Sequence, residues 1–209
     1  MTTRWEAEGL FVKVCGLGTP ADVEAAAEAG ADAVGFVFWE PSPRHHDLPT
    51  IRRLAEASPV TTVLVTVDLD SEDLLAAAAQ AGVDAVQPHG RHSGVAAAAA
   101  RRFGLGVICP IRAGEEPPAE ARDELLLIDT PHASLPGGTG ETFDWDTIAH
   151  LERRFLLAGG LDPENVAAAV RRVRPFGVDA SSGLESSPGV KDHARIRDFV
   201  KVAKEAHRS

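Results

Sequence analysis

Short apolar runs alternate with longer segments rich in Ala, Glu, Arg and Leu along most of the chain, and this alternation constrains the fold more than any other feature. Eight runs rich in Val, Ile, Leu or Phe are predicted to form strands. They span residues 11–15, 33–38, 60–67, 85–87, 106–109, 125–129, 155–158 and 177–179. Segments with the composition of amphipathic helices lie between them, such as 20–29, 71–81, 93–103 and 163–174. Alternating β and α elements predict a parallel sheet covered by helices, since parallel neighbours need a crossover connection.

Residues typical of helix ends support this segmentation. Thr19-Pro20 and Asp162-Pro163 each have the composition of a helix start, and Gly30 and Gly82 each stand where a left-handed C-terminal cap is expected. A weak internal repeat points the same way, because Ala29-Gly-Ala-Asp-Ala-Val34 returns as Ala81-Gly-Val-Asp-Ala-Val86. Gly177-Val-Asp-Ala180 echoes its centre, so each copy is interpreted as a helix end followed by a strand start.

Eight β-α units within 209 residues predict a closed (β/α)8 TIM barrel of minimal size and a single domain. We assign the barrel to residues 11–205 and an N-terminal extension to residues 1–10. An open, doubly wound sheet is the competing fold. It is disfavoured because Cys15-Gly-Leu-Gly18 is followed by Thr19-Pro20, which breaks the glycine spacing of a dinucleotide-binding fingerprint.

The charge balance excludes general attraction to nucleic acid or anionic membrane, because the formal net charge is −10. A small anionic ligand remains compatible with a locally positive site. Two cysteines suit a reducing compartment, and Arg4, Glu6 and Glu8 interrupt any apolar signal sequence. We therefore expect a cytoplasmic protein without a membrane-spanning segment.

Active sites of such barrels lie at the carboxyl ends of the strands. Three Gly- or Ser-rich segments follow the last three predicted strands: Pro136-Gly-Gly-Thr-Gly140, Ala158-Gly-Gly-Leu161 and Asp179-Ala-Ser-Ser-Gly183. Glycine lets backbone N–H groups approach an anion, and Ser and Thr add hydroxyl donors. We predict a phosphate-binding site there, although each segment alone fits a simple tight turn.

Cys15 ends the first strand and shares a face with Phe11 and Lys13 by strand alternation. If that face lines the barrel, Lys13 favours the thiolate, which makes Cys15 a base or nucleophile. A buried, inert structural cysteine is the alternative. Cys109, which precedes Pro110, is interpreted as a packing residue.

Asp129 ends the aliphatic run Leu125-Leu-Leu-Ile128, where burial raises a carboxyl pKa and produces a usable general acid. Capping of the next loop is its alternative role. Arg44, in the loop after the second strand, suits a carboxylate ligand or is a solvated loop charge. Histidines near strand ends include residues 45, 46, 89 and 132, but they lack metal-ligand spacing, so no metal is predicted.

The motifs taken together, from Lys13 to about Phe199, resemble the phosphoribosylanthranilate isomerase family of tryptophan biosynthesis. The resemblance is carried by Lys13-Val-Cys-Gly-Leu17, Gly35-Phe-Val-Phe38 with Ser42-Pro-Arg44, Gln87-Pro-His-Gly90, Leu135-Pro-Gly-Gly-Thr-Gly140 with Thr142-Phe-Asp-Trp145, Leu157-Ala-Gly-Gly-Leu161 with Pro163-Glu-Asn165, and Val178-Asp-Ala-Ser-Ser-Gly-Leu-Glu185. Each motif is weak alone, whereas their order and spacing together are specific.

The resemblance implies a cofactor-free Amadori rearrangement of N-(5-phosphoribosyl)anthranilate to 1-(2-carboxyphenylamino)-1-deoxyribulose 5-phosphate. It implies Cys15 as general base and Asp129 as general acid. It further implies that Arg44 holds the anthranilate carboxylate and that Asp179 lies near the sugar. It also implies that the phosphate is bound by Gly138, Gly140, Gly160, Ser182 and Gly183. The only partner implied is this small substrate, with the chain a monomer or a homodimer.

Two positions depart from the family pattern. Pro88 stands where Leu is usual, and Glu141 stands where Lys is common, which places an anion beside the proposed phosphate site. Two other functions stay open. One is another phosphosugar isomerase or epimerase, which would use paired carboxylates or a metal, and the other is a non-catalytic phosphosugar-binding barrel.

Overall fold

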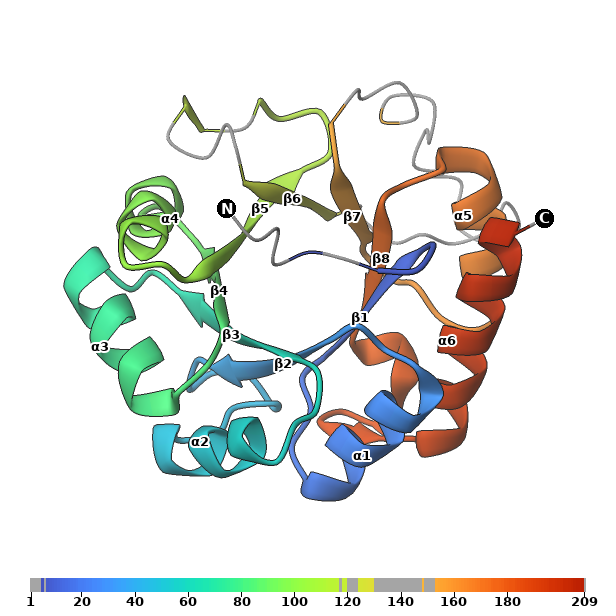
Figure 1. Ribbon diagram of the computed structural model, residues 1–209, viewed down its shortest axis with the longest axis horizontal. Helices are drawn as coiled ribbons and strands as arrows, with labels where there is room; N and C mark the ends of the chain where they lie inside the picture. The colour runs from blue at the N-terminus through green and yellow to red at the C-terminus, as the bar shows by residue number, and fades with distance from the viewer. Residues whose placement is uncertain are drawn as a thin grey trace.

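The eight predicted strands form a closed parallel barrel in the computed structural model (Figure 1). The structure describes residues 5, 7–116, 118–119, 124–129, 148 and 153–208. The strands are β1 (Phe11–Cys15), β2 (Ala33–Phe38), β3 (Thr61–Val67), β4 (Ala85–His89), β5 (Gly106–Arg112), β6 (Leu125–Asp129), β7 (Phe155–Ala158) and β8 (Gly177–Ala180). Pairing of β1 with both β2 and β8 closes the barrel and confirms the (β/α)8 fold over the open sheet.

The described helices surround the barrel (Figure 1). They are α1 (Pro20–Ala29), α2 (Leu48–Glu56), α3 (Ser71–Ala81), α4 (Ser93–Arg102), α5 (Val166–Val173) and α6 (His193–Arg208). A short 3-10 turn, η3 (Ser182–Leu184), follows β8 and leads into the antiparallel hairpin of β9 (Glu185–Ser187) and β10 (Val190–Lys191). The helix α6 continues to Arg208, past residue 205 at the predicted end of the barrel domain.

The predicted helix ends are largely confirmed. Thr19 forms a capping box with Asp22 at the start of α1, and Gly30 and Gly82 adopt left-handed φ angles of 91° and 66° at the ends of α1 and α3. The predicted start at Asp162-Pro163 is wrong, because α5 begins at Val166. Asp162 Oδ1 accepts the N–H of Asn165 at 2.8 Å, which forms a separate turn before the helix.

Three strands, β4, β5 and β8, are longer than predicted, and the first two of them each include a proline. Pro88 lies within β4 and Pro110 within β5. Pairing between β4 and β5 is confined to Ala85 with Gly106 and Val86 with Val107. Pro88 therefore lies beyond the paired part of that edge, where its missing N–H costs no ladder bond to β5.

The aspartates of the internal repeat act at strand starts. Asp32 Oδ2 accepts the N–H of Val12 at 2.8 Å, and Asp84 Oδ2 accepts the N–H of Thr62 at 2.9 Å. Each aspartate thus joins the start of its own strand to the preceding strand. Asp179 stands inside β8, so the interpretation of the third copy as a helix-to-strand junction is wrong.

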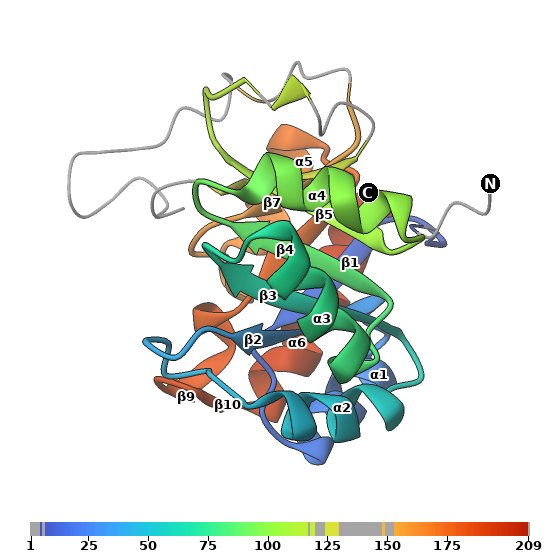
Figure 2. The same cartoon turned by 90° about the vertical axis from the view of Figure 1, so that its left-hand side faces the viewer.

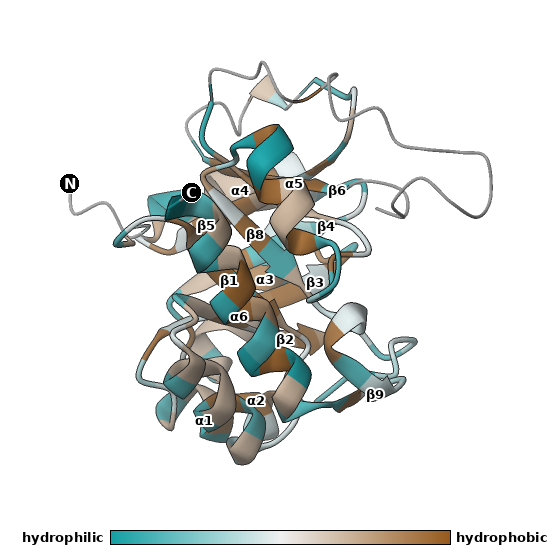
Figure 3. Ribbon diagram, turned by 90° about the vertical axis from the view of Figure 1, so that its right-hand side faces the viewer, coloured by the Kyte–Doolittle hydropathy of each residue, from teal (hydrophilic) through white to brown (hydrophobic). Residues whose placement is uncertain are grey.

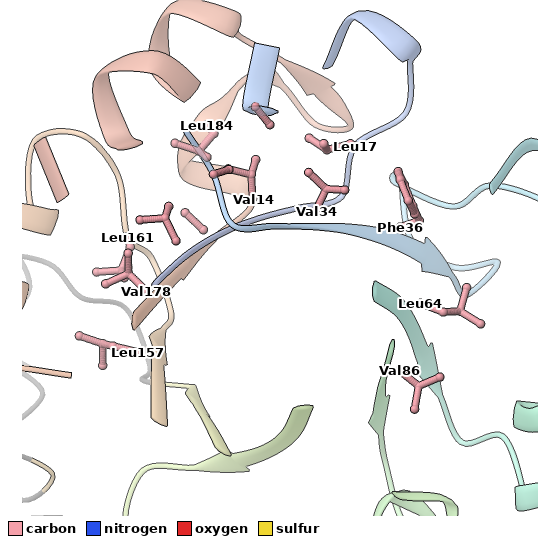
Figure 4. Close-up of a cluster of buried hydrophobic side chains, with 14 of the residues drawn as sticks. Val14, Leu17, Val34, Phe36, Leu64, Val86, Leu157, Leu161, Val178 and Leu184 are labelled. Atoms are coloured by element: carbon pink, nitrogen blue, oxygen red, sulfur yellow. The ribbon is translucent and has the colours of Figure 1, made fainter. Parts of the chain in front are cut away.

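Strand alternation separates two hydrophobic layers. Val14, Val34, Val86 and Val178 belong to the large cluster between the barrel and the helices, and in Figure 4 these side chains point outward from the strands. A second cluster fills the barrel interior with side chains from successive strands, including Phe11. Phe11, Lys13 and Cys15 therefore face inward, as predicted.

The described residues before β1 lie at the end of the barrel at which the strands begin, which faces the viewer in Figure 1. The ring of Trp5 packs edge-on against Phe11 at a centroid distance of 5.9 Å, and Phe11 stacks on Phe176 at 5.5 Å. Arg154 lies over the Phe176 ring and donates to the carbonyl of Trp5. Aromatic rings thus cover this end.

The opposite end carries the strand termini and the β9–β10 hairpin (Figure 2). Figure 3, from the other side, places β9 at the same end and shows mixed polar and apolar colouring on the helices, as expected for amphipathic segments. In the described part of the chain, no helix has the length and apolar character needed to cross a membrane.

Candidate active site

A cavity of about 260 Å³ opens at the carboxyl ends of the strands. Five of the predicted site residues line it: Cys15, Asp129, Gly160, Asp179 and Ser182. A second hollow of about 400 Å³ adjoins it and shares His89 and Asp129 with it. The structure therefore brings together the predicted acid, the predicted base and part of the predicted phosphate segment.

A buried ion pair lies beside the cavity. Lys13 Nζ donates to Asp179 Oδ1 at 2.9 Å, and the lysine side chain is fully buried inside the barrel. Burial opposes the charge on Lys13, but Asp179 and Cys15 outweigh it and raise the lysine pKa. Gly35 makes room for this arrangement, because a Cβ there would lie 2.8 Å from Cys15 Sγ. Lys13 is thus a permanent cation next to Cys15.

The protonation state of Cys15 differs from the prediction that this thiol is kept ionised. Burial raises the pKa of this thiol, and Asp179 adds to the effect, while Lys13 and Lys191 oppose it. The resting group is therefore a neutral thiol. The error arises because sequence alone indicates the neighbouring cation but not the depth of burial, which disfavours the thiolate.

Asp129 ends β6 at the rim, with its side chain exposed to the solvent. Partial burial of the carboxyl raises the pKa of Asp129, the negative charge of Asp179 raises it further, and Arg112 opposes both effects. The predicted direction is confirmed, although its setting is a cavity edge rather than a closed apolar pocket. A raised pKa suits a carboxyl group that must donate a proton.

The glycine segments are only partly within the described residues. Gly159 and Gly160 have left-handed φ angles of 97° and 61° where the backbone lines the cavity. Gly183 does not line it. A Cβ at this position would collide with the carbonyl of Leu161 in the neighbouring loop. Its role is close backbone approach between the loops after β7 and β8. Gly138 and Gly140 lie outside the described residues.

Arg44 lies at the cavity mouth rather than in its lining. A Cβ on Gly16, the residue after Cys15, would lie 2.7 Å from Arg44 Cδ and 2.9 Å from Ser181 Oγ. The guanidinium forms a two-pronged pair with Glu185, with Nε donating to Oε1 at 2.6 Å and Nη2 to Oε2 at 2.7 Å. Sequence reasoning assigned no role to Glu185 or to its second partner, Lys191. Pro188-Gly189 between them is a dipeptide that marks a turn, but nothing in the sequence identifies Arg44 as the partner of this hairpin.

Gln87 and His89 end β4 and line the cavity, and sequence reasoning gave them no role. Their side-chain nitrogens lie 2.9 Å apart. Burial, aided by the charge of Lys13, lowers the pKa of His89 to about 4, so its imidazole is neutral at pH 7. Among the described residues, no three His, Cys, Asp or Glu side chains are arranged as a metal site.

Comparison with known proteins gives a consistent result. The family profile described as "N-(5'phosphoribosyl)anthranilate (PRA) isomerase" matches residues 12–202. A protein of Cereibacter sphaeroides named N-(5'-phosphoribosyl)anthranilate isomerase is 44% identical, over 94% of this chain and 99% of its own length. This chain belongs to the phosphoribosylanthranilate isomerase family. It is therefore an isomerase of tryptophan biosynthesis with a (β/α)8 barrel, in agreement with the sequence resemblance.

Solved structures of phosphoribosylanthranilate isomerases share the fold closely. The crystal structure of TrpF from Jonesia denitrificans superposes with a TM-score of 0.84 at 42% identity, covering 94% of this chain and 98% of that one. A second phosphoribosylanthranilate isomerase was crystallised with reduced 1-(o-carboxyphenylamino)-1-deoxyribulose 5-phosphate. It superposes with a TM-score of 0.78 at 35% identity and covers 94% of this chain and 99% of that one.

Proposed function

We propose that this isomerase converts N-(5-phosphoribosyl)anthranilate to 1-(2-carboxyphenylamino)-1-deoxyribulose 5-phosphate, with Asp129 as general acid and Cys15 as general base. Asp129 donates its proton to the furanose ring oxygen. The bond from that oxygen to C1′ breaks, and the nitrogen lone pair forms a protonated imine with C1′. The raised pKa of Asp129 supports this role, because it keeps a larger share of the carboxyl protonated.

Cys15 then removes the proton from C2′, and the electrons of that C–H bond form an enolamine while neutralising the imine nitrogen. Loss of the 2′-hydroxyl proton and protonation of C1′ complete the ketone. C1′ is reduced and C2′ oxidised within one molecule, so the reaction needs no external electron carrier. Lys13 supports the thiolate, and the cationic imine adds a second favourable charge at the moment when the base is required.

The two anionic ends of the substrate fit two separate groups of residues at the cavity mouth. We place the carboxylate of the anthranilate at Arg44 and the phosphate at the glycine and serine segments after β7 and β8. Gly160 and Ser182 line the cavity there, and Gly183 holds the two loops together. Gly138 and Gly140 complete the proposed phosphate site, and Asp179 positions Lys13 beside the sugar. A chain with a net charge of −10 thus has local cations where the ligand is negative.

The observation that carries this proposal is the presence of Cys15 and Asp129 in the lining of one cavity, with the Lys13–Asp179 pair next to the thiol. The two groups come from β1 and β6, far apart in sequence. An acid and a base that face one small cavity suit two consecutive proton transfers on a sugar.

The test follows the loss of fluorescence of freshly made phosphoribosylanthranilate, with EDTA present. Wild-type protein should turn the substrate over, and Cys15→Ala and Asp129→Asn should each lower kcat by about 10²- to 10⁴-fold. Cys109→Ala is the matched control, because this buried thiol is not in the cavity lining, and it should retain activity. Absence of turnover by folded wild type would contradict the function, while full activity of Cys15→Ala would discard the base alone.

A further inference from the structure

Two cations share one carboxylate beside the cavity mouth. Glu185 accepts both prongs of Arg44, at 2.6 and 2.7 Å, and also accepts from Lys191 Nζ at 2.9 Å. The side chains of Glu185 and Lys191 are 5% and 0% exposed, whereas Arg44 is 21% exposed. Arg44 is therefore the most exposed member of this ion cluster, and its side chain is the one that a ligand can reach.

The three residues come from segments that pack tightly against each other. Arg44 belongs to the loop after β2, Glu185 begins β9, and Lys191 ends β10. At the hairpin turn, Gly189 has a φ of 81°, and a Cβ there would collide with the carbonyl of Pro43, the neighbour of Arg44. Gly16 likewise leaves no room for a side chain under Arg44. Backbone contacts thus hold the hairpin against the loop that bears Arg44.

The cluster carries two positive charges against one negative charge. Glu185 occupies Nε and Nη2 of Arg44, and no described residue accepts from Nη1. An anion is therefore the group that would balance the charge. Fork-shaped pairing fixes the plane of a guanidinium as well as its position. Glu185 thereby determines the direction in which the remaining N–H donors of Arg44 point.

Lys191 extends the cluster toward the other anionic end of the substrate. Its Nζ also donates to the carbonyl of Ser181 at 2.9 Å and lies 3.4 Å from Ser181 Oγ. Ser181 lines the cavity next to Ser182 of the proposed phosphate segment. The same buried lysine thus connects the carboxylate holding Arg44 with the loop after β8.

We propose that Glu185 is a positioning residue that orients Arg44 for the carboxylate on the aromatic ring of the substrate, and so determines the specificity of the isomerase for a carboxylated arylamine. This inference rests on the proposed function, in which Arg44 holds that carboxylate. Glu185 touches neither C1′ nor C2′ of the sugar in this scheme. Its loss therefore weakens recognition of one ligand group more than it slows the proton transfers.

A binding experiment separates positioning from general support of the fold. Two probes are titrated by calorimetry: reduced 1-(o-carboxyphenylamino)-1-deoxyribulose 5-phosphate, and its counterpart lacking the ring carboxylate. Glu185→Gln should raise the Kd of the carboxylated probe by about tenfold or more, as expected for the loss of one charge-assisted contact. It should change the Kd of the other probe by less than about twofold, and it should raise KM more than it lowers kcat.

Controls make the result decisive even if Glu185→Gln folds poorly. Glu185→Asp keeps the buried charge for Lys191 but is too short for both prongs, and it should show the same selective loss. Glu56→Gln removes the exposed Arg52 pair on α2 and should change neither Kd. In an Arg44→Ala background, Glu185→Gln should have no further effect on the carboxylated probe.

The outcomes distinguish this inference from the proposed function. The positioning role would be overturned if Glu185→Gln and Glu185→Asp weakened the binding of both probes equally, or if the effects of the Glu185 and Arg44 substitutions were additive. Turnover by wild type would still support the proposed function in that case. An unchanged Kd in both variants would also overturn the positioning role. Wild type that neither binds the carboxylated probe nor turns over the substrate would overturn the proposed function and this inference together.

Discussion

At the residue scale, the protonation states of Cys15 and Asp129 oppose their proposed roles. The pKa of the buried thiol is raised from 9.0, and that of Asp129 from 3.8, yet Asp129 keeps an exposed side chain and remains the stronger acid. The predominant resting form therefore has a neutral thiol and a carboxylate. The reactive form, with a thiolate and a protonated carboxyl, is a minor tautomer that holds the same number of protons.

This arrangement predicts a specific pH dependence. For wild type, kcat/KM should be constant at pH values between the pKa of Asp129 and the pKa of Cys15. It should decrease at lower pH, where the protein binds a further proton, and at higher pH, where the shared proton is lost. Asp129→Asn removes the titrating acid, so its low residual rate should rise with pH until Cys15 is ionised, with no alkaline fall. Pre-steady-state or steady-state profiles of both proteins measure this difference.

Thiolate absorbance in the ultraviolet provides an independent check. The difference spectrum of wild type and Cys15→Ala should show no thiolate at neutral pH and a rise only in alkaline solution, because burial raises the pKa of Cys15. Cys109 cancels in this difference, since it is present in both proteins and burial raises its pKa to about 11. A Cys15 thiolate already present at neutral pH, or an alkaline fall that persists in Asp129→Asn, would contradict the assignment.

At the element scale, the loops after β7 and β8 act as one unit because Gly183 permits backbone contact with Leu161. Gly183→Ala should force these loops apart. We expect a loss of unfolding free energy of about 1–3 kcal/mol, as in other overpacked sites. We also expect weaker binding of inorganic phosphate, because the segments proposed to bind it no longer meet. Chemical denaturation and competitive inhibition by phosphate measure the two effects.

Gly82→Ala is the matched control for that substitution. Unlike Gly183, Gly82 has a left-handed φ, of 66°, and a Cβ there would have nothing within 4 Å. It should therefore cost only about 1 kcal/mol of backbone strain and leave phosphate inhibition unchanged. Equal loss of phosphate inhibition in both variants, or none in Gly183→Ala, would show that the loop contact does not shape the site.

The elements also show how far sequence reasoning reaches. The bounds of α1 and α3 agree with prediction because their caps are local: Thr19, Gly30 and Gly82 stabilise helix ends through their own backbone or side chain. The predicted start of α5 is wrong because Asp162 accepts the backbone N–H of Asn165 in a turn that precedes the helix. An aspartate is equally suited to a helix start and to such a turn, so the residue type does not distinguish them.

The residues of the candidate site also differ in how far the sequence predicts their positions. Cys15 and Asp129 stand at strand ends, so a barrel topology alone directs them to one cavity. Glu185 meets Arg44 only after a hairpin, in which Lys191 bonds to Glu185, folds back on the loop after β2. Such long-range pairing leaves no periodic signal in the sequence. The depth of Cys15, which reverses the expected direction of its pKa, is likewise a property of the closed barrel.

At the scale of the whole molecule, the candidate active site and the aromatic cluster that covers the strand starts lie at opposite ends of the barrel. Trp5, Phe11 and Phe176 pack together where the strands begin, and Arg154 ties Trp5 to this group. These contacts join the N-terminal segment to β1 and to the starts of β7 and β8. They lie at the seam where β1 pairs with β8 and closes the barrel. Stability at this seam should therefore be separable from catalysis at the other end.

Trp5→Ala tests this separation. Removal of the indole should lower the free energy of unfolding by about 1–3 kcal/mol, less than for a fully buried tryptophan because Trp5 is only partly buried. At temperatures where the variant is folded, kcat and KM should equal those of wild type. Phe103→Ala, at the end of α4, removes an aromatic ring that is 75% exposed and should change neither quantity. Unchanged stability of Trp5→Ala would mean that the contacts of Trp5 do not stabilise the barrel, whereas a changed KM would mean that the two ends are coupled through the barrel interior.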